Sequence, residues 1–281
     1  MNKVKKERVD VLLVERGICE TREKAKRAIM AGVIFSGTER LEKPGEKIPE
    51  DAPLEKKGND LRYVSRGGLK LEKALAEFAV TVEGKMMLDI GSSTGGFTDC
   101  ALQNGARHGY ALDVGYNQLA WKIRQDPRVT VMERTNFRHS KPEDFQEGLP
   151  EVATIDVSFI SLRIILPVLK SILVPGGDCI ALVKPQFEAG RDKVGKKGIV
   201  RDPKVHQEVL QKVAAYAIDC GFEVKAMTHS PITGGEGNIE FLFHLVSNEQ
   251  ATKSELPDAH SFAQTVEHAH SAFKEKNTQS N

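Results

Sequence analysis

The sequence predicts an α/β protein: a doubly wound, mostly parallel sheet with a C-terminal antiparallel hairpin, preceded by a small α+β domain. Three observations predict this class. From about residue 69 onward, short apolar runs alternate with stretches of helical periodicity, as in repeated βαβ units. Only a loop separates the last two apolar runs, so they should pair antiparallel. Before residue 69 the elements are shorter and the chain is more basic, which indicates a separate domain.

The first 58 residues predict a compact module of two helices and a small hairpin. Residues 8–16 place three apolar side chains on one helical face before Gly17. Thr21 is the expected N-cap of a second helix, which should end at Gly32. A short strand at 33–35 and a Ser-Gly turn follow. A module of this size is marginal alone, so we expect it to dock or to bind another molecule.

Positive charge is concentrated in this N-terminal part. The 281 residues include 40 Lys+Arg and 39 Asp+Glu, a net charge of +1, yet residues 1–70 carry +5 and the remainder −4. The overall balance excludes a histone-like polycation, so any nucleic-acid surface must be a local patch. A small domain can also be basic by chance, so charge alone does not decide whether this domain binds nucleic acid. The outer face of the second helix carries four basic residues, namely Arg22, Lys24, Lys26 and Arg27.

The larger part of the chain is expected to form the sheet. A polar, glycine-containing stretch at 59–68 predicts a linker, residues 69–247 the α/β domain, and residues 248–281 a polar tail with one short helix near 260–273. The expected strands are 86–90, 110–114, 129–132, 153–157, 179–183, 223–228 and 239–246. The expected helices are 69–78, 96–103, 162–173 and 203–220.

A glycine-rich motif stands where the first of these strands gives way to a helix. Residues 88–97 read Leu-Asp-Ile-Gly-Ser-Ser-Thr-Gly-Gly-Phe. This is neither the dinucleotide pattern Gly-x-Gly-x-x-Gly nor a phosphate-binding loop ending in Gly-Lys-Ser/Thr. Ligands of open α/β sheets bind beyond the strand ends, and glycines let the backbone approach them closely. A ligand-binding loop is therefore favoured over a purely structural turn.

Polar side chains also follow the next strands of the predicted sheet. Asp113, Asn136, Asp156 and Lys184 each stand at a strand end, and such ends share one edge of a parallel sheet. An acid at the tip of the second strand commonly hydrogen-bonds the hydroxyls of a ribose. A solvated strand-end aspartate is the plain alternative for Asp113. The convergence of several such groups favours a binding crevice.

These motifs resemble the class I, S-adenosylmethionine-dependent ribose 2′-O-methyltransferases of the FtsJ type, which have a Rossmann-like sheet. Over residues 5–246 the chain is similar to the TlyA (haemolysin A-like) rRNA methyltransferases. The N-terminal module resembles the RNA-binding module of the fourth small-subunit ribosomal protein. The motifs that carry the resemblance lie at residues 64–71, 91–98, 113–116, 134–136, 156–161, 182–188 and 237–240.

The resemblance implies methylation of cytidine 2′-hydroxyls in rRNA, on 50S and in some members also 30S subunits. It also implies a catalytic tetrad of Lys70, Asp156, Lys184 and Glu240. A ribose hydroxyl is a poor nucleophile unless its proton is accepted during attack. We expect Lys184 to accept that proton or to hold the nascent alkoxide, with burial and the neighbouring cation Lys70 favouring its neutral amine. Asp156 would orient Lys184, while Lys70 and Glu240 would position the hydroxyl.

The cofactor implied by the resemblance is S-adenosylmethionine. Its sulfonium is already a good leaving group, so no metal is expected. Asp89 should support the glycine loop from beneath rather than touch the ligand. The expected contacts are Gly91, Ser93, Thr94, Gly95 and Gly96 for the methionine part, Asp113 for the ribose and Asn136 for the adenine side.

A second basic segment follows the fifth strand. Residues 189–202 are rich in glycine and basic residues, which suits phosphate contacts and ordering on RNA. A solvated charged loop is the alternative. With the second helix this segment would form a basic track that favours structured RNA and salt-sensitive binding. The further expected RNA contacts are Arg62, Arg66, Arg191, Lys193, Lys196 and Lys197, with Arg201 nearby.

No secretory or membrane signal is visible in the sequence. The N-terminus is charged with no apolar core behind it, and the longest apolar run, 164–174, has 11 residues and includes Pro167 and Lys170. The four cysteines, at 19, 100, 179 and 220, are too scattered to predict a zinc site or a disulfide scaffold. A reducing cytoplasm is therefore expected.

Three other functions compete with an rRNA methyltransferase. A haemolysin that acts on membranes is disfavoured by the missing apolar segments. A methyltransferase for a small hydroxyl acceptor, with an accessory RNA-binding module, would use the same four charged residues. An RNA-binding protein with an inactive transferase centre is disfavoured because all four are present. The sequence leaves open the modified nucleotide, the ribosomal subunit, the role of the tail and the oligomeric state.

Overall fold

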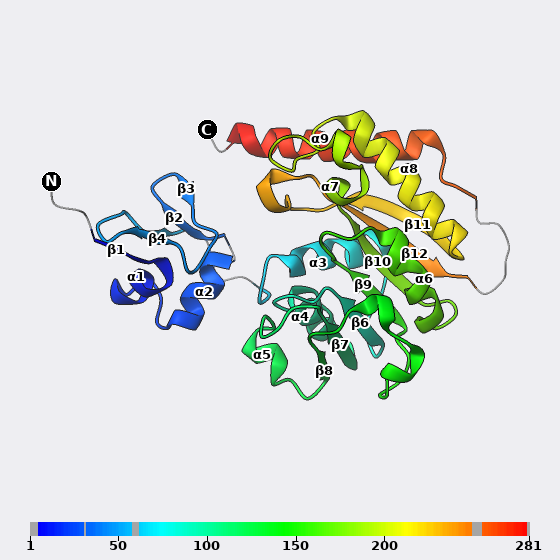
Figure 1. Ribbon diagram of the computed structural model, residues 1–281, viewed down its shortest axis with the longest axis horizontal. Helices are drawn as coiled ribbons and strands as arrows, with labels where there is room; N and C mark the ends of the chain where they lie inside the picture. The colour runs from blue at the N-terminus through cyan, green and yellow to red at the C-terminus, as the bar shows by residue number, and fades with distance from the viewer. Residues whose placement is uncertain (1–4, 31, 58–61, 249–254, 280–281) are drawn as a thin grey trace. The chain divides into compact units, whose positions relative to one another are not determined.

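The computed structural model describes residues 5–30, 32–57, 62–248 and 255–279 (Figure 1). The chain divides into two compact units, Met1–Gly68 and Leu69–Asn281. Each unit has a hydrophobic core of its own.

The N-terminal unit packs two short helices against small antiparallel sheets. Its core comes from the apolar faces of both helices, with Leu13 and Ile29 almost completely buried. The amide of Lys24 donates to the Thr21 hydroxyl at 3.2 Å, which confirms the predicted N-cap. The helices are α1 (Val9–Glu15) and α2 (Arg22–Met30), and the strands are β1 (Lys6–Arg8), β2 (Ile34–Ser36), β3 (Glu39–Arg40), β4 (Lys47–Pro49) and β5 (Glu55–Lys56).

Strands β1, β4 and β5 were not predicted. They are two or three residues long and rich in charged side chains, so they show no alternation of apolar and polar residues. β1 pairs with β4, and β2 pairs with both β3 and β5, always antiparallel. Pairing of neighbouring backbones, not hydrophobic pattern, therefore defines these strands.

The C-terminal unit is built on a seven-stranded sheet with the order β11-β12-β10-β9-β6-β7-β8. The five strands from β10 to β8 are parallel, and β12 runs antiparallel to both β10 and β11. This confirms the predicted mostly parallel sheet and hairpin. The strands are β6 (Met86–Ile90), β7 (His108–Leu112), β8 (Val129–Met132), β9 (Val152–Ile155), β10 (Asp178–Val183), β11 (Phe222–His229) and β12 (Phe241–Ser247).

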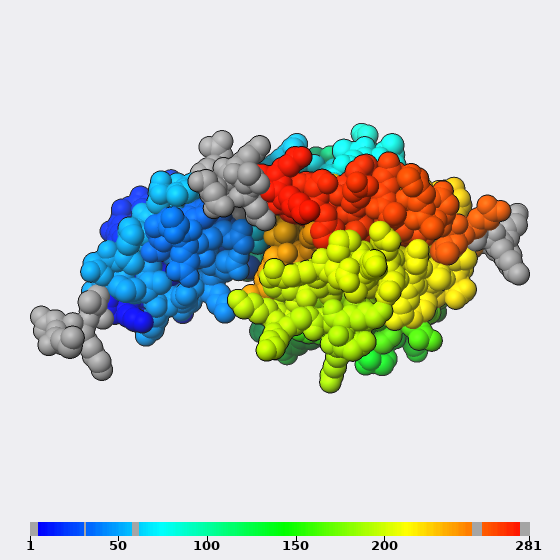
Figure 2. All heavy atoms as spheres, turned by 90° about the horizontal axis from the view of Figure 1, so that it is seen from above, coloured from blue at the N-terminus to red at the C-terminus, as the bar shows by residue number. Residues whose placement is uncertain are grey.

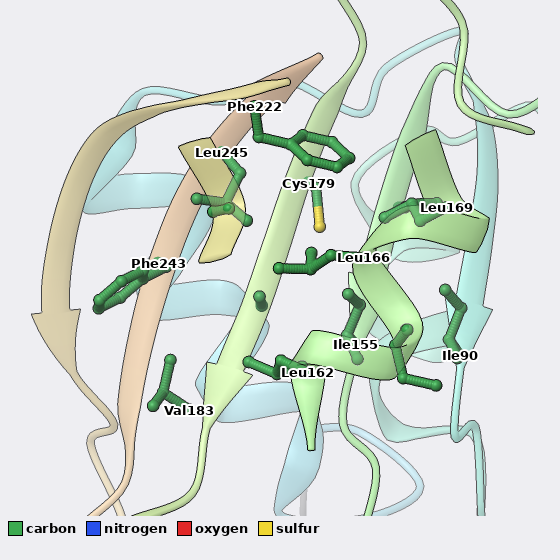
Figure 3. Close-up of a cluster of buried hydrophobic side chains, with 14 of the residues drawn as sticks. Ile90, Ile155, Leu162, Leu166, Leu169, Cys179, Val183, Phe222, Phe243 and Leu245 are labelled. Atoms are coloured by element: carbon green, nitrogen blue, oxygen red, sulfur yellow. The ribbon is translucent and has the colours of Figure 1, made fainter. Parts of the chain in front are cut away.

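Helices lie on both faces of this sheet (Figure 1). One face carries the main core, in which Leu162, Leu166 and Leu169 of α6 pack onto strand residues such as Ile155 and Cys179 (Figure 3). Within the described residues, no helix is long and apolar enough to cross a membrane. The helices are α3 (Gly67–Phe78), α4 (Gly96–Gln103), α5 (Trp121–Arg124), α6 (Leu162–Ile172), α7 (Pro185–Glu188), α8 (Pro203–Asp219) and α9 (Ala259–Gln279).

The predicted polar tail is wrong for its described part. Helix α9 is longer than the short helix expected near 260–273, and Phe262, Val266 and Ala269 are buried in the main core. Figure 2 shows α9 beside α8 on the surface of the unit, and the two helices are in contact. These three residues recur at helical spacing, but the surrounding polar residues mask them in a simple reading of composition.

The predicted linker at 59–68 is also only partly correct. Residues 58–61 lie outside the described residues, but Tyr63 and Val64 are buried and α3 begins at Gly67 rather than at residue 69. A side chain at Gly68 would collide with the ring of Tyr63. Gly68, one of the glycines that suggested a linker, therefore allows close packing of Tyr63 at the start of a helix.

Candidate functional site

The candidate site lies at the edge of the sheet where the parallel strands end. β6, β7, β9 and β10 all end there because they are parallel neighbours. β12 runs the opposite way and pairs Phe241 with Val183, so it begins at this edge. Glu240, which precedes β12, is thereby brought to the end of β10, where Lys184 follows. The antiparallel strand thus adds a carboxylate from far along the chain.

All four residues of the predicted tetrad meet at this edge. Nζ of Lys70, in the first turn of α3, lies 2.7 Å from Glu240 Oε2 and 3.4 Å from Asp156 Oδ2. Nζ of Lys184 lies 2.5 Å from Asp156 Oδ1. Three ion pairs therefore join the side chains in the order Lys184, Asp156, Lys70 and Glu240.

The tetrad is largely withdrawn from water. Lys70, Lys184 and Glu240 are at most 9 % exposed, and two cations balance two anions, which offsets the cost of burying them. Burial alone would raise the pKa of Asp156, but the two lysine ammonium groups hold it below its usual range. Burial alone would lower the pKa of Lys70, but Asp156 and Glu240 raise it. Asp156 and Lys70 are therefore held in their charged forms.

Two local features fix the ends of this charge chain. Lys184 precedes Pro185 and has an extended backbone, as expected for a residue before proline, and its Nζ lies 3.2 Å from the Ser158 hydroxyl. At the other end, a Cβ on Gly234 would collide with the carboxylate of Glu240. Glycine at this position thus leaves the space that Glu240 occupies beside Lys70.

The glycine loop joins β6 to α4 next to the tetrad. Gly91 has φ +85°, and a Cβ there would collide with the backbone carbonyl of Asp156. Gly95 has φ +91° and caps α4, which begins at Gly96. The carbonyl of Thr94 accepts from the amide of Ala120 at 3.1 Å. The predicted loop residues therefore lie in one tight turn beside the tetrad.

Asp89 supports this loop from within the core. Its carboxylate accepts hydrogen bonds from the hydroxyl of Thr98 at 2.7 Å and from that of Thr154 at 2.9 Å. Complete burial raises the pKa of Asp89 to about 6. Asp89 thus ties the start of α4 to β6 and β9.

Asp113 and Asn136 lie at the ends of the next two strands. The carboxylate of Asp113 accepts from the amide of Ser93 at 2.8 Å and from that of Gly115 at 2.6 Å. It is half-buried, so part of it still faces solvent. Asn136 is exposed, and its side-chain oxygen accepts from the amide of Arg138 at 3.2 Å. The structure therefore links Asp113 directly to the glycine loop, whereas Asn136 caps a separate short helix.

The basic face predicted for α2 is partly neutralised. Arg22 donates to the buried Asp10 at 2.9 Å, Lys26 pairs with Glu23 at 3.0 Å, and Lys24 pairs with Glu20. The arginines beside Asp10 hold the pKa of that carboxyl at about 2, although burial opposes the shift. The remaining expected contacts of this unit are Arg27, which is exposed, and Arg62 and Arg66, of which Arg62 lies over the ring of Tyr63.

The second basic segment, residues 189–202, is anchored at its C-terminal end. The side-chain oxygen of Asn238 accepts from the amide of Val200 at 3.1 Å, and its amide group donates to Gly198 at 2.9 Å. Lys193 forms an ion pair with Glu208. The side chains expected to contact RNA are exposed, namely Arg191, Lys193, Lys196 and Lys197. Asn238 thus ties the C-terminal end of this segment to the start of the hairpin strand β12.

Several residues near the tetrad were not identified from the sequence. Phe159 is 91 % exposed with φ +63°, and its ring lies 5.0 Å from that of Phe187. Glu188 is buried and bonds the start of α6. Both stand in motifs that carry the resemblance, 156–161 and 182–188, but nothing in the sequence indicated their roles, because a phenylalanine in an apolar run predicts burial and a glutamate after a strand predicts exposure. Asn238 stood in a recognised motif without a predicted role.

Comparison with known families agrees with this geometry. The sequence matches the family model described as FtsJ-like methyltransferase over residues 63–247, and the S4 domain over residues 7–52. The fold is that of a Rossmann-like methyltransferase joined to a small S4 domain. The chain belongs to the FtsJ-like methyltransferase family.

Three similar proteins cover nearly the whole chain. One is the Bacillus subtilis protein described as "Putative rRNA methyltransferase YqxC", 68 % identical over 97 % of both chains. Another is the Mycobacterium tuberculosis 16S/23S rRNA (cytidine-2′-O)-methyltransferase TlyA, 41 % identical over 85 % of this chain and 89 % of that protein. A solved structure described as "Putative hemolysin from Streptococcus thermophilus" is 55 % identical, covers 98 % of this chain and 100 % of its own, and has a TM-score of 0.79.

Proposed function

We propose that this protein transfers a methyl group from S-adenosylmethionine to the 2′-hydroxyl of a cytidine in rRNA. The observation that carries the proposal is the buried chain of ion pairs from Lys184 through Asp156 and Lys70 to Glu240, next to the glycine loop. Relatives named as rRNA methyltransferases support the substrate class. Such a substrate would place the protein in the cytoplasm.

The glycine loop and Asp113 fit the proposed cofactor. Gly91 and Gly95 have positive φ angles, and a Cβ on Gly91 would collide with the carbonyl of Asp156 and one on Gly95 with Leu119, so this tight turn requires glycine at both positions. Each carboxylate oxygen of Asp113 accepts one amide in the structure, and each has further acceptor capacity for ribose hydroxyls. Ser93, Thr94 and Gly96 would surround the methionine part, and Asn136 would lie on the adenine side.

The tetrad can position and activate a ribose hydroxyl, which by itself is a poor nucleophile. The cofactor, when bound, supplies an electrophilic methyl on a good leaving group, so the residues need only position and deprotonate the hydroxyl. In its ion pair with Asp156, which orients it, the Lys184 ammonium can hold the nascent alkoxide. To act as the base, Lys184 must first release its own proton to solvent, and its neutral amine then accepts the proton of the hydroxyl. Lys70 and Glu240 hold the hydroxyl for in-line attack. Because ion pairs already fix these groups, little reorganisation is required during transfer.

Features outside the tetrad favour RNA over a small hydroxyl acceptor. The N-terminal S4 domain carries Arg22 and Arg27, and the catalytic unit carries the exposed lysines of residues 189–202. Phe159 exposes its ring on the loop that follows Asp156. Proteins that bind unpaired nucleotides commonly stack bases on such rings. A small alcohol would need neither an aromatic platform nor a second domain.

Methyl transfer to isolated ribosomal subunits tests the proposal. Unmodified 30S and 50S subunits are incubated with labelled S-adenosylmethionine, and the labelled position is mapped by nuclease-resistant dinucleotides, which report 2′-O-methylation. We expect label at a cytidine ribose in 23S rRNA, and label in 16S rRNA would extend the substrate to both subunits. No label in either subunit, with cofactor binding retained, would contradict the proposal and favour another RNA, a small acceptor or an inactive centre.

A further inference from the structure

Glu188 is a buried carboxylate that the proposed mechanism does not use. It ends the short helix α7, four residues after Lys184, and is 6 % exposed. One carboxylate oxygen accepts from the Ser161 hydroxyl at 2.7 Å, and the other accepts from the amide of Leu162 at 2.8 Å. Both partners stand at the start of α6, where backbone amides lack partners within the helix.

These bonds close a loop that begins at the tetrad. The loop of residues 156–161 starts at Asp156, which pairs with Lys184, and ends at Ser161, which bonds Glu188. Between these ends, the ring of Phe159 lies 5.0 Å from that of Phe187. The segments after β9 and β10 are therefore joined at three successive places.

The backbone of the loop needs such support. Phe159 has φ +63°, a conformation that is unfavourable for a residue with a bulky side chain and persists only where neighbours impose it. Its ring is almost completely exposed, so core packing does not hold it. The hydrogen bonds of Glu188 fix the far end of the loop, two residues after Phe159.

A buried carboxylate at this position indicates that its hydrogen bonds have a role. Burial raises the pKa of Glu188, so this site disfavours its charge, and Lys212 contacts only its backbone carbonyl, at 3.5 Å. A buried polar group is costly unless its hydrogen bonds are made. Here both oxygens are used to join two active-site segments, which a nonpolar side chain of similar size would not do.

We propose that Glu188 is a positioning residue for methyl transfer, which holds the 156–161 loop so that Asp156 and Ser158 stay in place around Lys184. The inference rests on the proposed function for its effect on rate, but the effect on the loop is independent of it. Glu188 touches neither the tetrad nor the glycine loop through its carboxylate. Its loss should therefore affect the transfer step more than the binding of either substrate.

Three variants test this role. Glu188→Ala removes both hydrogen bonds, whereas Glu188→Gln retains an oxygen for the amide of Leu162 and an amide group that can donate to Ser161. Asp258→Ala is the matched control, because Asp258 accepts from the amide of Ser261 at 2.8 Å and caps α9, away from the tetrad. The readouts are the single-turnover rate of methyl transfer, the calorimetric Kd for S-adenosylmethionine and amide hydrogen exchange.

We expect Glu188→Ala to lower the rate at least tenfold with Kd changed less than twofold, and Glu188→Gln to recover most of the rate. Asp258→Ala should lower the melting temperature without lowering the rate. Hydrogen exchange of residues 157–162 should rise in Glu188→Ala, while that of residues 91–96 should not. If Glu188→Ala does not fold, Ser161→Ala removes one of the same bonds and should show a smaller loss in the same direction.

Different results would overturn the proposed function and the positioning role of Glu188. A wild-type protein that transfers nothing to rRNA would overturn the proposed function, while the exchange experiment would still decide the role of Glu188. Unchanged exchange of the loop in Glu188→Ala would overturn the positioning role. Equal losses of rate in Glu188→Ala and Glu188→Gln, or an equal loss in the Asp258→Ala control, would do the same.

Discussion

Lys70 and Lys184 enter the tetrad from different parts of the fold and share one carboxylate, that of Asp156. Lys70 also pairs with Glu240, whereas Lys184 has the Ser158 hydroxyl as its further neighbour. Lys70 is therefore held between two anions, and Lys184 forms the end of the chain of ion pairs. This difference suits Lys70 to a fixed electrostatic role and Lys184 to direct contact with the hydroxyl.

Asp113 gives a testable prediction at the residue scale. Asp113→Ala should weaken S-adenosylmethionine binding several-fold, because it removes both the proposed ribose contact and the acceptor that holds the Ser93 amide. Asp113→Asn retains one side-chain oxygen, so its affinity for S-adenosylmethionine should lie between those of the wild type and Asp113→Ala. Isothermal titration calorimetry measures both variants. An affinity equal to that of the wild type in Asp113→Ala would remove Asp113 from the cofactor site.

The four residues of the tetrad could be named from the sequence because each stands in a motif that carries the resemblance, although Lys70 lies on helix α3 and not at a strand end. The contact of Asp156 with Lys184 was expected, but the ion pair of Glu240 with Lys70 was not, because Glu240 reaches Lys70 only through the antiparallel pairing of β12 with β10. The role of Glu188 was also invisible. It depends on the backbone amide of Leu162, and a backbone group carries no mark in a sequence.

At the scale of single elements, α9 is the main departure from the predicted fold. Besides its buried apolar residues, it places His270 against His206 of α8, with Nε2 of His270 and Nδ1 of His206 3.0 Å apart. Nε2 of His206 lies 3.1 Å from the carbonyl of Val200, which can only accept. Nε2 of His206 must therefore carry the proton, and its Nδ1 accepts from His270.

This histidine pair makes stability depend on pH. Burial first, and the neighbouring His270 second, lower the pKa of His206 to about 4, so the folded protein favours the neutral ring. The stabilisation is present above the unfolded pKa of about 6.5 and is lost as pH falls towards 4. We expect about 3 kcal/mol of unfolding free energy to disappear over this range. Asp202 and Lys274 also act on the pair, with opposite charges.

Denaturant unfolding between pH 7 and pH 4 measures this effect. His206→Gln keeps a polar side chain but does not titrate, so its unfolding free energy should fall less over the same range. Hydrogen exchange of α9 should show where the wild type loses protection. Parallel curves for the wild type and His206→Gln would show that the histidine pair does not contribute.

On the scale of the whole molecule, the chain joins a small S4 domain to an FtsJ-like methyltransferase unit. The chain divides near residue 68, close to the boundary suggested by the change in charge and periodicity. The sequence predicted both units well because each has its own pattern of apolar residues. It misjudged the segments at their margins, Tyr63–Gly68 and α9, where a few buried residues are hidden among polar ones.

Salt dependence tests the proposed RNA surface. Binding of an rRNA fragment should weaken steeply with salt, because each lysine at a phosphate displaces a counterion. Replacing both Lys196 and Lys197 with alanine should reduce the slope of log Kd against log salt by roughly 1.5. Lys225→Ala is the control, since Lys225 lies on the edge strand β11 and pairs with Glu223. A slope unaffected by the double substitution would remove this segment from the RNA surface.

The most direct test of the central claim is the single-turnover rate of methyl transfer by Lys184→Ala and Lys184→Arg on the subunit that the wild type labels. The account predicts a loss of more than tenfold in Lys184→Ala with unchanged cofactor affinity. Arginine keeps the charge but cannot accept a proton, so recovery in Lys184→Arg would indicate that the side chain holds the alkoxide, and loss that it acts as the base. A fall of less than tenfold in Lys184→Ala, with the cofactor still bound, would contradict the assignment of the tetrad.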